Sequence, residues 1–69
     1  MDLTWENGFT IDVRIVNGAA VIRANREGLL SLANHMKTLA EEPAGSHIHL
    51  DPYNALEDGS DGLILERID

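Results

Sequence analysis

The spacing of apolar residues changes along this chain, and the changes predict where strands and a helix lie. From residue 10 to 16, apolar and polar side chains alternate, which is typical of a half-buried strand. From residue 25 to 42, the apolar period lengthens to about 3.6, the period of an amphipathic helix. Short apolar runs at 47–51 and 63–68 then predict two further strands.

Residues 9 to 24 predict a β-hairpin. Asn17 and Gly18 form a preferred two-residue turn, because both positions tolerate a positive φ. A turn there fixes the register, pairing Val13 with Ile22. The same register puts a set of apolar side chains on one face, which we expect to lie beneath the helix: Ile11, Val13, Ile15, Ala20, Ile22 and Ala24.

The predicted helix has a clear beginning and end. Asn25 is a good N-cap residue, since its side-chain oxygen can accept a hydrogen bond from a free amide of the first turn. Pro43 disfavours helical geometry at Glu42, so the helix should end there. The stripe expected to face the strands consists of Leu29, Leu32, Ala33, Met36, Leu39 and Ala40, with Leu30 beside it. The side expected to face water carries Ser31, Asn34, His35, Thr38 and Glu41.

The strand after the helix has two distinct faces. Ile48 and Leu50 share one face, and the polar residues His47, His49 and Asp51 share the other. At the N-terminus, a turn at residues 7–8 would make residues 3–5 an edge strand. That register points Trp5 away from the helix unless a bulge corrects it. Trp5 is therefore either a contact anchor on an open face or a cover for the end of the core.

The order strand, strand, helix, strand, strand predicts one α+β domain, residues 1–69. We expect a mostly antiparallel four-stranded sheet, with the N-terminal edge strand as an optional addition and one helix packed on one face. The opposite face would present Val16, Val21, His47, His49, Ile64, Glu66 and Ile68. A face this apolar indicates contact with a protein partner or a second copy of the chain.

Composition narrows the classes of function. With 12 acidic and 5 basic residues, the net charge is -7, which argues against nucleic-acid binding because that needs a basic face. The charge serves either solubility or attraction to a basic partner. There is no cysteine, so no disulfide supplements a small core. The sequence also lacks an apolar run of membrane-spanning length and a basic signal-peptide start, so we expect a soluble cytoplasmic protein without membrane contact.

His47 and His49 are the best candidate metal ligands, because alternate residues of a strand share a face. Asp51 is awkward as a third ligand, since its Cα lies about 13 Å along the strand from that of His47. Glu66 or His35 would have to complete the site. Such a pair more often serves hydrogen bonding or a contact surface, so no metal and no other cofactor is expected.

The acidic segment from residue 57 to 62 does not predict a calcium or phosphate site. In the EF-hand template, either Gly59 or Leu56 falls at a ligand position, and a phosphate loop needs a Lys-Ser/Thr ending. No serine lies in a nucleophile elbow, and a chain of this size has little room for an enclosed pocket. We therefore expect no enzymatic activity.

Three groups of residues between positions 25 and 66 carry a family resemblance. They are Asn25-x-x-Gly28-Leu29 with Leu32-Ala33, His47-x-His49-Leu50-Asp51, and Leu56-Glu57-x-Gly59-Ser60 followed by Leu63-Ile64-x-Glu66. This part of the chain resembles the immunity protein 32 family of bacterial polymorphic-toxin systems, although Asp58 stands where glutamate is expected. The resemblance implies a small α+β protein that binds and neutralises a cognate toxin.

These observations lead to two main hypotheses of different functional class and to a third, weaker one. In the first, the chain is a non-enzymatic immunity-type protein that blocks a toxin domain by covering it. Its candidate contact residues are Trp5, His47, His49, Asp51, Glu57, Asp58, Asp61 and Glu66. In the second, the chain is a homodimeric structural or regulatory module whose open sheet face is buried against itself. The third is a small protein that binds metal through His47 and His49.

Overall fold

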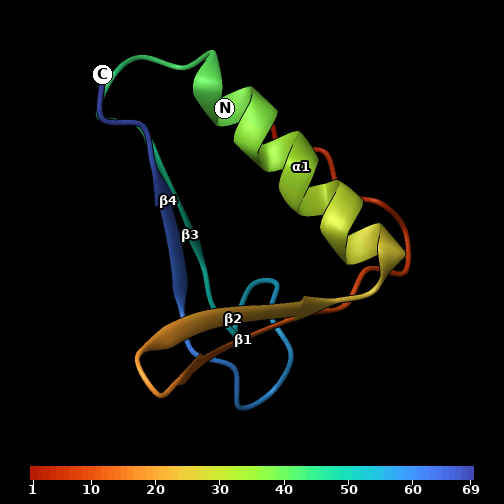
Figure 1. Cartoon of the computed structure of the whole chain (residues 1–69). Helices are drawn as coiled ribbons and strands as arrows, with labels where there is room; N and C mark the ends of the chain where they lie inside the picture. Colours follow the sequence, from red (N-terminus) through yellow and green to blue (C-terminus); the bar gives the residue numbers. More distant parts are fainter.

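The predicted order of elements is confirmed by the computed structural model, which describes residues 1–69. The elements are strand β1 (Ile11–Val16), strand β2 (Ala19–Ala24), helix α1 (Arg26–Ala40), strand β3 (His47–Leu50) and strand β4 (Leu63–Glu66). The fold class is therefore α+β, as the sequence predicts. Figure 1 shows α1 along one side of the molecule, β3 and β4 along a second side, and the β1–β2 hairpin across the bottom.

The β1–β2 hairpin has the predicted turn and the predicted register. Asn17 and Gly18 both adopt a positive φ, 50° and 80°, which is the backbone conformation that this tight turn requires. Val13 lies opposite Ile22, and every pair from Ile11 with Ala24 to Val16 with Ala19 follows in step. Local turn chemistry is thus sufficient to specify this part of the fold.

The four strands form two separate two-stranded sheets instead of one continuous four-stranded sheet. The sheets stay separate because a loop, not a third strand, occupies the free edge of β1. The backbone amide of Glu57 donates to the carbonyl of Ile11 at 2.9 Å, and that of Asp61 donates to the carbonyl of Val13 at 2.7 Å. β4 therefore pairs only with β3.

The N-terminal segment is not an edge strand, which corrects one expectation from the sequence. The chain turns at Gly8, where φ is 81°, and the segment before it runs against α1. The amide of Glu6 donates to Ser31 Oγ at 2.8 Å, and the rings of Trp5 and His35 meet edge to face at 4.1 Å between centroids. Trp5 is half-buried in this position.

The helix is rotated relative to the predicted orientation by roughly a quarter of a turn. Ser31 and His35, expected in water, are fully buried, whereas Leu29 and Met36 are 55% and 47% exposed. The rotation has a cause in the chain: the N-terminal segment packs on the polar flank and provides a hydrogen bond for Ser31. The predicted apolar stripe is therefore wrong for four residues, which lie at the surface: Leu29, Ala33, Met36 and Ala40.

The buried core comes from β1, α1, β3 and the loop that follows β3. Its fully buried apolar members are Ile11, Val13, Leu32, Leu39, Ile48, Leu50 and Leu56. Arg67 links the sheet to the end of α1, because its Nη1 donates to the carbonyls of Ala40 at 3.0 Å and Glu42 at 2.6 Å. Both chain ends lie at this end of α1 (Figure 1). With 15 residues, α1 lacks the length and the hydropathy to cross a membrane.

Candidate partner-binding site

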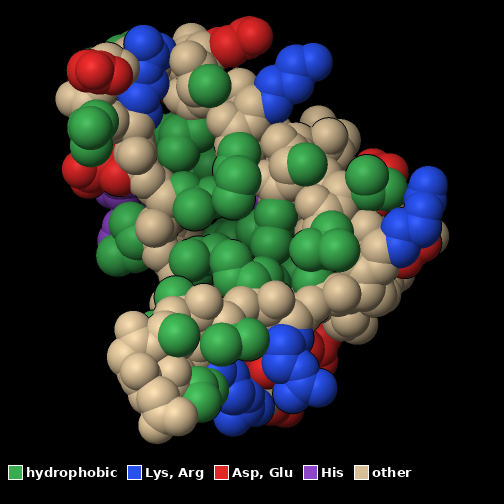
Figure 2. All heavy atoms as spheres, in the orientation of Figure 1, with side chains coloured by type: hydrophobic (Ala, Val, Ile, Leu, Met, Phe, Trp, Pro, Cys, Tyr) green, Lys and Arg blue, Asp and Glu red, His purple; other side chains and the backbone are tan.

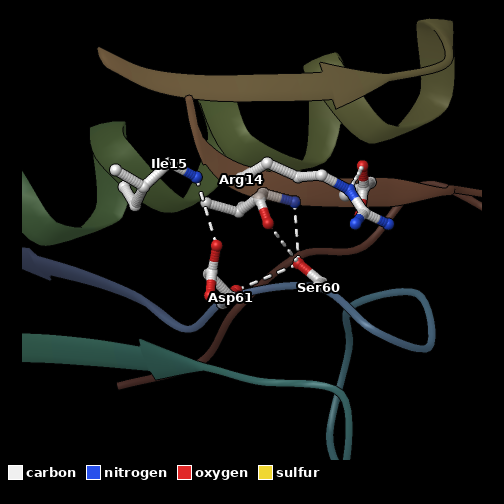
Figure 3. Close-up of polar contacts among 6 residues, drawn as sticks. Arg14, Ile15, Ser60 and Asp61 are labelled. Carbon is white, nitrogen blue, oxygen red and sulfur yellow. Dashed lines mark hydrogen bonds and ion pairs between the residues drawn. The ribbon is translucent and has the colours of Figure 1, made fainter. Parts of the chain in front are cut away.

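The acidic loop, which we define as residues 57–61, is held along the free edge of β1 like a short extra strand. Its backbone makes the two hydrogen bonds to β1 described above, and two side chains add to them (Figure 3). Ser60 Oγ accepts from the amide of Val13 at 2.7 Å and lies 3.1 Å from the Val13 carbonyl, to which it can donate. Asp61 Oδ2 accepts from the amide of Ile15 at 3.1 Å.

The sharp bend of the acidic loop depends on Gly59. Its φ of 80° lies in the left-handed region, where a side chain would be strained. The bend is closed by the amide of Ser60, which donates to the carbonyl of Glu57 at 3.1 Å. The structure thus gives a local reason for the Leu56-Glu57-x-Gly59-Ser60 pattern: it holds Glu57 and Asp58 at the surface over a fixed backbone.

A hollow of about 460 Å³ lies between the acidic loop and the outer face of the hairpin. Its lining is mostly polar and comprises Thr10, Ile11, Asp12, Arg14, Arg23, Ala24, Glu57 and Asp58. Inside it, Arg14 Nε donates to Asp12 Oδ2 at 3.0 Å, and this hydrogen bond raises the pKa of Arg14. The other oxygen of Asp12 is buried and has no hydrogen-bond partner within the chain. The hollow therefore combines charges of both signs at one surface.

His47 and His49 lie together on the exposed outer face of β3. Their ring centroids are 4.8 Å apart, and across the strand pair His47 faces Glu66 while His49 faces Ile64. Of the two third ligands considered for a metal, Glu66 is thus a neighbour, whereas His35 is buried against Trp5. No cluster of three or more metal-ligating side chains occurs in the structure.

Asp51 has a structural task that sequence reasoning did not foresee. Its Oδ1 accepts from the amides of Tyr53 at 2.8 Å and Asn54 at 3.1 Å, and its carbonyl accepts from the amides of residues 54–56. The carboxylate therefore shapes the turn that follows β3 instead of extending the histidine face. Asn54 Nδ2 completes the turn by donating to the carbonyl of His49 at 2.9 Å.

The predicted contact residues consequently fall into two groups on the two sheets. Glu57, Asp58 and Asp61 lie on the edge of β1, and His47, His49 and Glu66 lie on the outer face of the β3–β4 sheet. The half-buried Trp5 belongs to neither group, because it packs on α1. Sequence reasoning missed the basic members of the hollow, Arg14 and Arg23. The hairpin register already placed both on the outer face and would have revealed them.

His35 is an ionisable group in the interior, and its burial predicts how the stability of the fold depends on pH. The side chain is fully buried, and neither ring nitrogen has a hydrogen-bond partner. Desolvation by burial lowers the pKa of His35, and the neighbouring Thr4 backbone only partly opposes this. The folded chain therefore binds a proton here less readily than the unfolded chain, whose histidine has its ordinary pKa of about 6.5.

We expect the contribution of His35 to the free energy of unfolding to be most favourable above pH 6.5. As the pH falls from about 6.5 toward the lowered folded pKa, stability should drop by up to about 1.4 kcal/mol per pH unit, because protons bind preferentially to the unfolded chain. Urea unfolding between about pH 7.5 and pH 5 measures this. His35→Leu should flatten the pH dependence, whereas His47→Gln, at an exposed site, should not. An unchanged slope in His35→Leu would contradict the assignment.

Taken together, the geometry is that of a small α+β domain with polar side chains gathered on the edge of β1 and on the outer face of the β3–β4 sheet. The family model described as immunity protein 32 matches residues 20–68, which is more than two-thirds of the chain. The chain therefore belongs to the immunity protein 32 family, as its motifs predicted. The match runs from β2 through α1 and β3 to the acidic loop and β4. No curated protein and no solved structure matches the chain.

Proposed function

We propose that this protein is a non-enzymatic immunity protein that binds a cognate toxin domain in the cytoplasm and blocks it by covering its functional surface. Family membership supports the general role. The observation that carries the proposal is the acidic loop, whose exposed carboxylates stand on a backbone fixed to β1 by hydrogen bonds. A surface that is already ordered loses little conformational entropy on binding.

The charge of the chain supports a basic partner surface, such as the substrate-binding face of a nuclease toxin. The net charge is -7, and the acidic loop concentrates three carboxylates within five residues. Such complementarity accelerates association and selects partners more than it strengthens the final complex. The hollow beside the loop and the separate face formed by His47, His49 and Glu66 are the other contact regions in this proposal.

The test is to mix the purified chain with the toxin domain encoded beside it and to measure complex formation and toxin activity. A one-to-one complex with loss of toxin activity is expected. The double variant Glu57→Gln, Asp58→Asn should lower the association rate by about tenfold at low salt and weaken its salt dependence. Both side chains are exposed, so the fold should be unaffected.

The matched control is Asp2→Asn, Glu41→Gln, which removes two charges at exposed positions outside the acidic loop. It should leave most of the association rate intact. Equal losses in both double variants would show that only net charge matters and would remove the loop from the contact surface. Failure of the unmodified chain to bind or to protect against the toxin would refute the proposed function.

A further inference from the structure

One face of the molecule remains apolar and uncovered. Figure 2 shows hydrophobic side chains filling the recess framed by α1, the β3–β4 sheet and the hairpin. Six exposed apolar side chains lie on two of the elements that frame the recess, and together they are here called the open apolar face: Leu29, Ala33, Met36 and Ala40 on α1, and Ile15 and Ile22 on the hairpin. Ile15 is 60% exposed, although it belongs to the hairpin face that contributes the buried Ile11 and Val13.

The chain is more open than a compact monomer of its size. Its accessible surface is 4694 Å², whereas the scaling for compact monomers gives about 4,300 Å² at 7.6 kDa. Its radius of gyration is 12.0 Å, against about 11 Å expected for 69 residues. Only 11 of the 69 residues are buried, so much of the apolar surface that could form a core remains in water.

This surplus surface can be compared with the area that self-association buries. A standard interface takes about 800 Å² from each partner, and in homodimers about 65% of it is apolar. The surplus of about 400 Å² in total accessible surface is about half of what one partner contributes to such an interface. The polar residues around the recess would supply the rim. Contact with a second copy would therefore remove the surplus surface from water.

The open apolar face carries no charge that would select a basic toxin as its occupant. None of the six residues of the open apolar face is ionisable, in a chain in which 25% of residues are charged. Burying it costs no charge desolvation, but it also lacks the carboxylates that would select a basic partner. Exposed Arg26 and Lys37 border the stripe on α1, and at this face they locally reduce the repulsion between two copies that each carry a net charge of -7.

The exposed apolar residues of α1 have the spacing found where two helices pack against each other. Leu29 and Met36 are seven residues apart, and so are Ala33 and Ala40, which is the heptad spacing of paired helices. The two alanines permit a close approach of the helix axes. We propose that this face pairs with the same face of a second copy in a two-fold dimer, with the α1 helices antiparallel at its centre. The acidic loop stays outside this contact, so the proposal does not depend on the proposed function.

Sedimentation equilibrium of the full chain across the micromolar range tests the proposal. The unmodified chain should reach twice its mass of 7.6 kDa. Met36→Glu should weaken association by at least about tenfold, because two carboxylates would be buried across the two-fold axis. Ala33→Arg provides a second variant at an exposed helical position, with the same expected loss. Circular dichroism establishes that each variant is folded.

Ile64→Glu is the matched control, since Ile64 is 60% exposed on the outer face of β4. It should remain dimeric. The proposal is overturned if the unmodified chain is monomeric throughout, or if folded Met36→Glu and Ala33→Arg remain dimers. If the unmodified chain is monomeric and Met36→Glu also loses toxin binding, the toxin is the occupant of this face.

Discussion

Gly28→Ala is expected to destabilise the fold by about 3 kcal/mol or more, although the same change in most helices stabilises by up to about 1 kcal/mol. Gly28 lies in the first turn of α1, where the helix meets the hairpin. A Cβ at this position would clash with the backbone oxygen of Thr10 and would lie 3.0 Å from both Ala24 Cβ and Ile11 Cγ1. Two of these obstacles belong to fixed parts of the hairpin, so the helix itself would have to move.

Moving the helix would break the hydrogen bonds that set this close approach. Asn25 Oδ1 accepts from the amides of Gly28 at 2.8 Å and Thr10 at 3.0 Å, and Asn25 Nδ2 donates to the carbonyl of Gly8 at 3.0 Å. A single side chain therefore caps the helix and fastens it to the segment that enters β1. The spacing Asn25-x-x-Gly28 follows from this geometry: the cap brings the backbones together, and glycine leaves room for them.

Urea unfolding of Gly28→Ala measures the effect. Ala33→Gly is the matched control, because it makes the reverse exchange at an exposed position of the same helix. It should cost only about 0.5–1 kcal/mol, the ordinary helix-propensity difference. If Gly28→Ala were as stable as the unmodified chain, the close contact between α1 and Thr10 would be wrong.

The features that the sequence predicts correctly are those with local causes. The turn at Asn17-Gly18 specifies the hairpin and its register without help from the rest of the chain. Asn25 caps the helix as expected, and the helix ends at Ala40, just before Pro43. Each of these outcomes depends on backbone preferences of residues a few positions apart, which a single sequence contains.

The orientation of α1 could not be predicted in the same way. Its apolar stripe and its buried face differ because the N-terminal segment, more than 20 positions away, supplies the amide that binds Ser31 and the ring that covers His35. Hydrophobic periodicity assigns a buried serine and a buried histidine to the solvent side. Only the packing of distant segments reveals that they are interior.

Some features of the candidate site can likewise be identified from the sequence, and others only from the structure. Its acidic residues and its histidine face can be identified from composition and strand alternation. The attachment of the acidic loop to the edge of β1 has no local sequence pattern, because the loop has neither alternation nor β-branched residues. The double role of Asp61, as an exposed charge and as acceptor for the amide of Ile15, is likewise visible only in the structure.

Ser60→Ala should cost about 2–3 kcal/mol and should release the acidic loop from β1. Val13 is 1% exposed, and its amide has Ser60 Oγ as its partner at 2.7 Å. Removing the hydroxyl leaves a buried donor without a partner, which costs about 1–3 kcal/mol, and it also removes the hydrogen bond to the Val13 carbonyl or that of Asp61. In a domain this small, such a loss is a large part of the total stability.

Urea unfolding gives the stability change of Ser60→Ala, and hydrogen exchange of the Val13 amide gives its location, since that amide should become much less protected. Asp61→Asn is the matched control: its amide oxygen can still accept from Ile15, so the cost should stay below about 1 kcal/mol. A Val13 amide that stays as protected in Ser60→Ala as in the unmodified chain would show that the loop is held by its backbone alone. If the loop is released as expected, toxin association should slow in Ser60→Ala even though every charge is retained, because the carboxylates of Glu57 and Asp58 would no longer be held in place before binding.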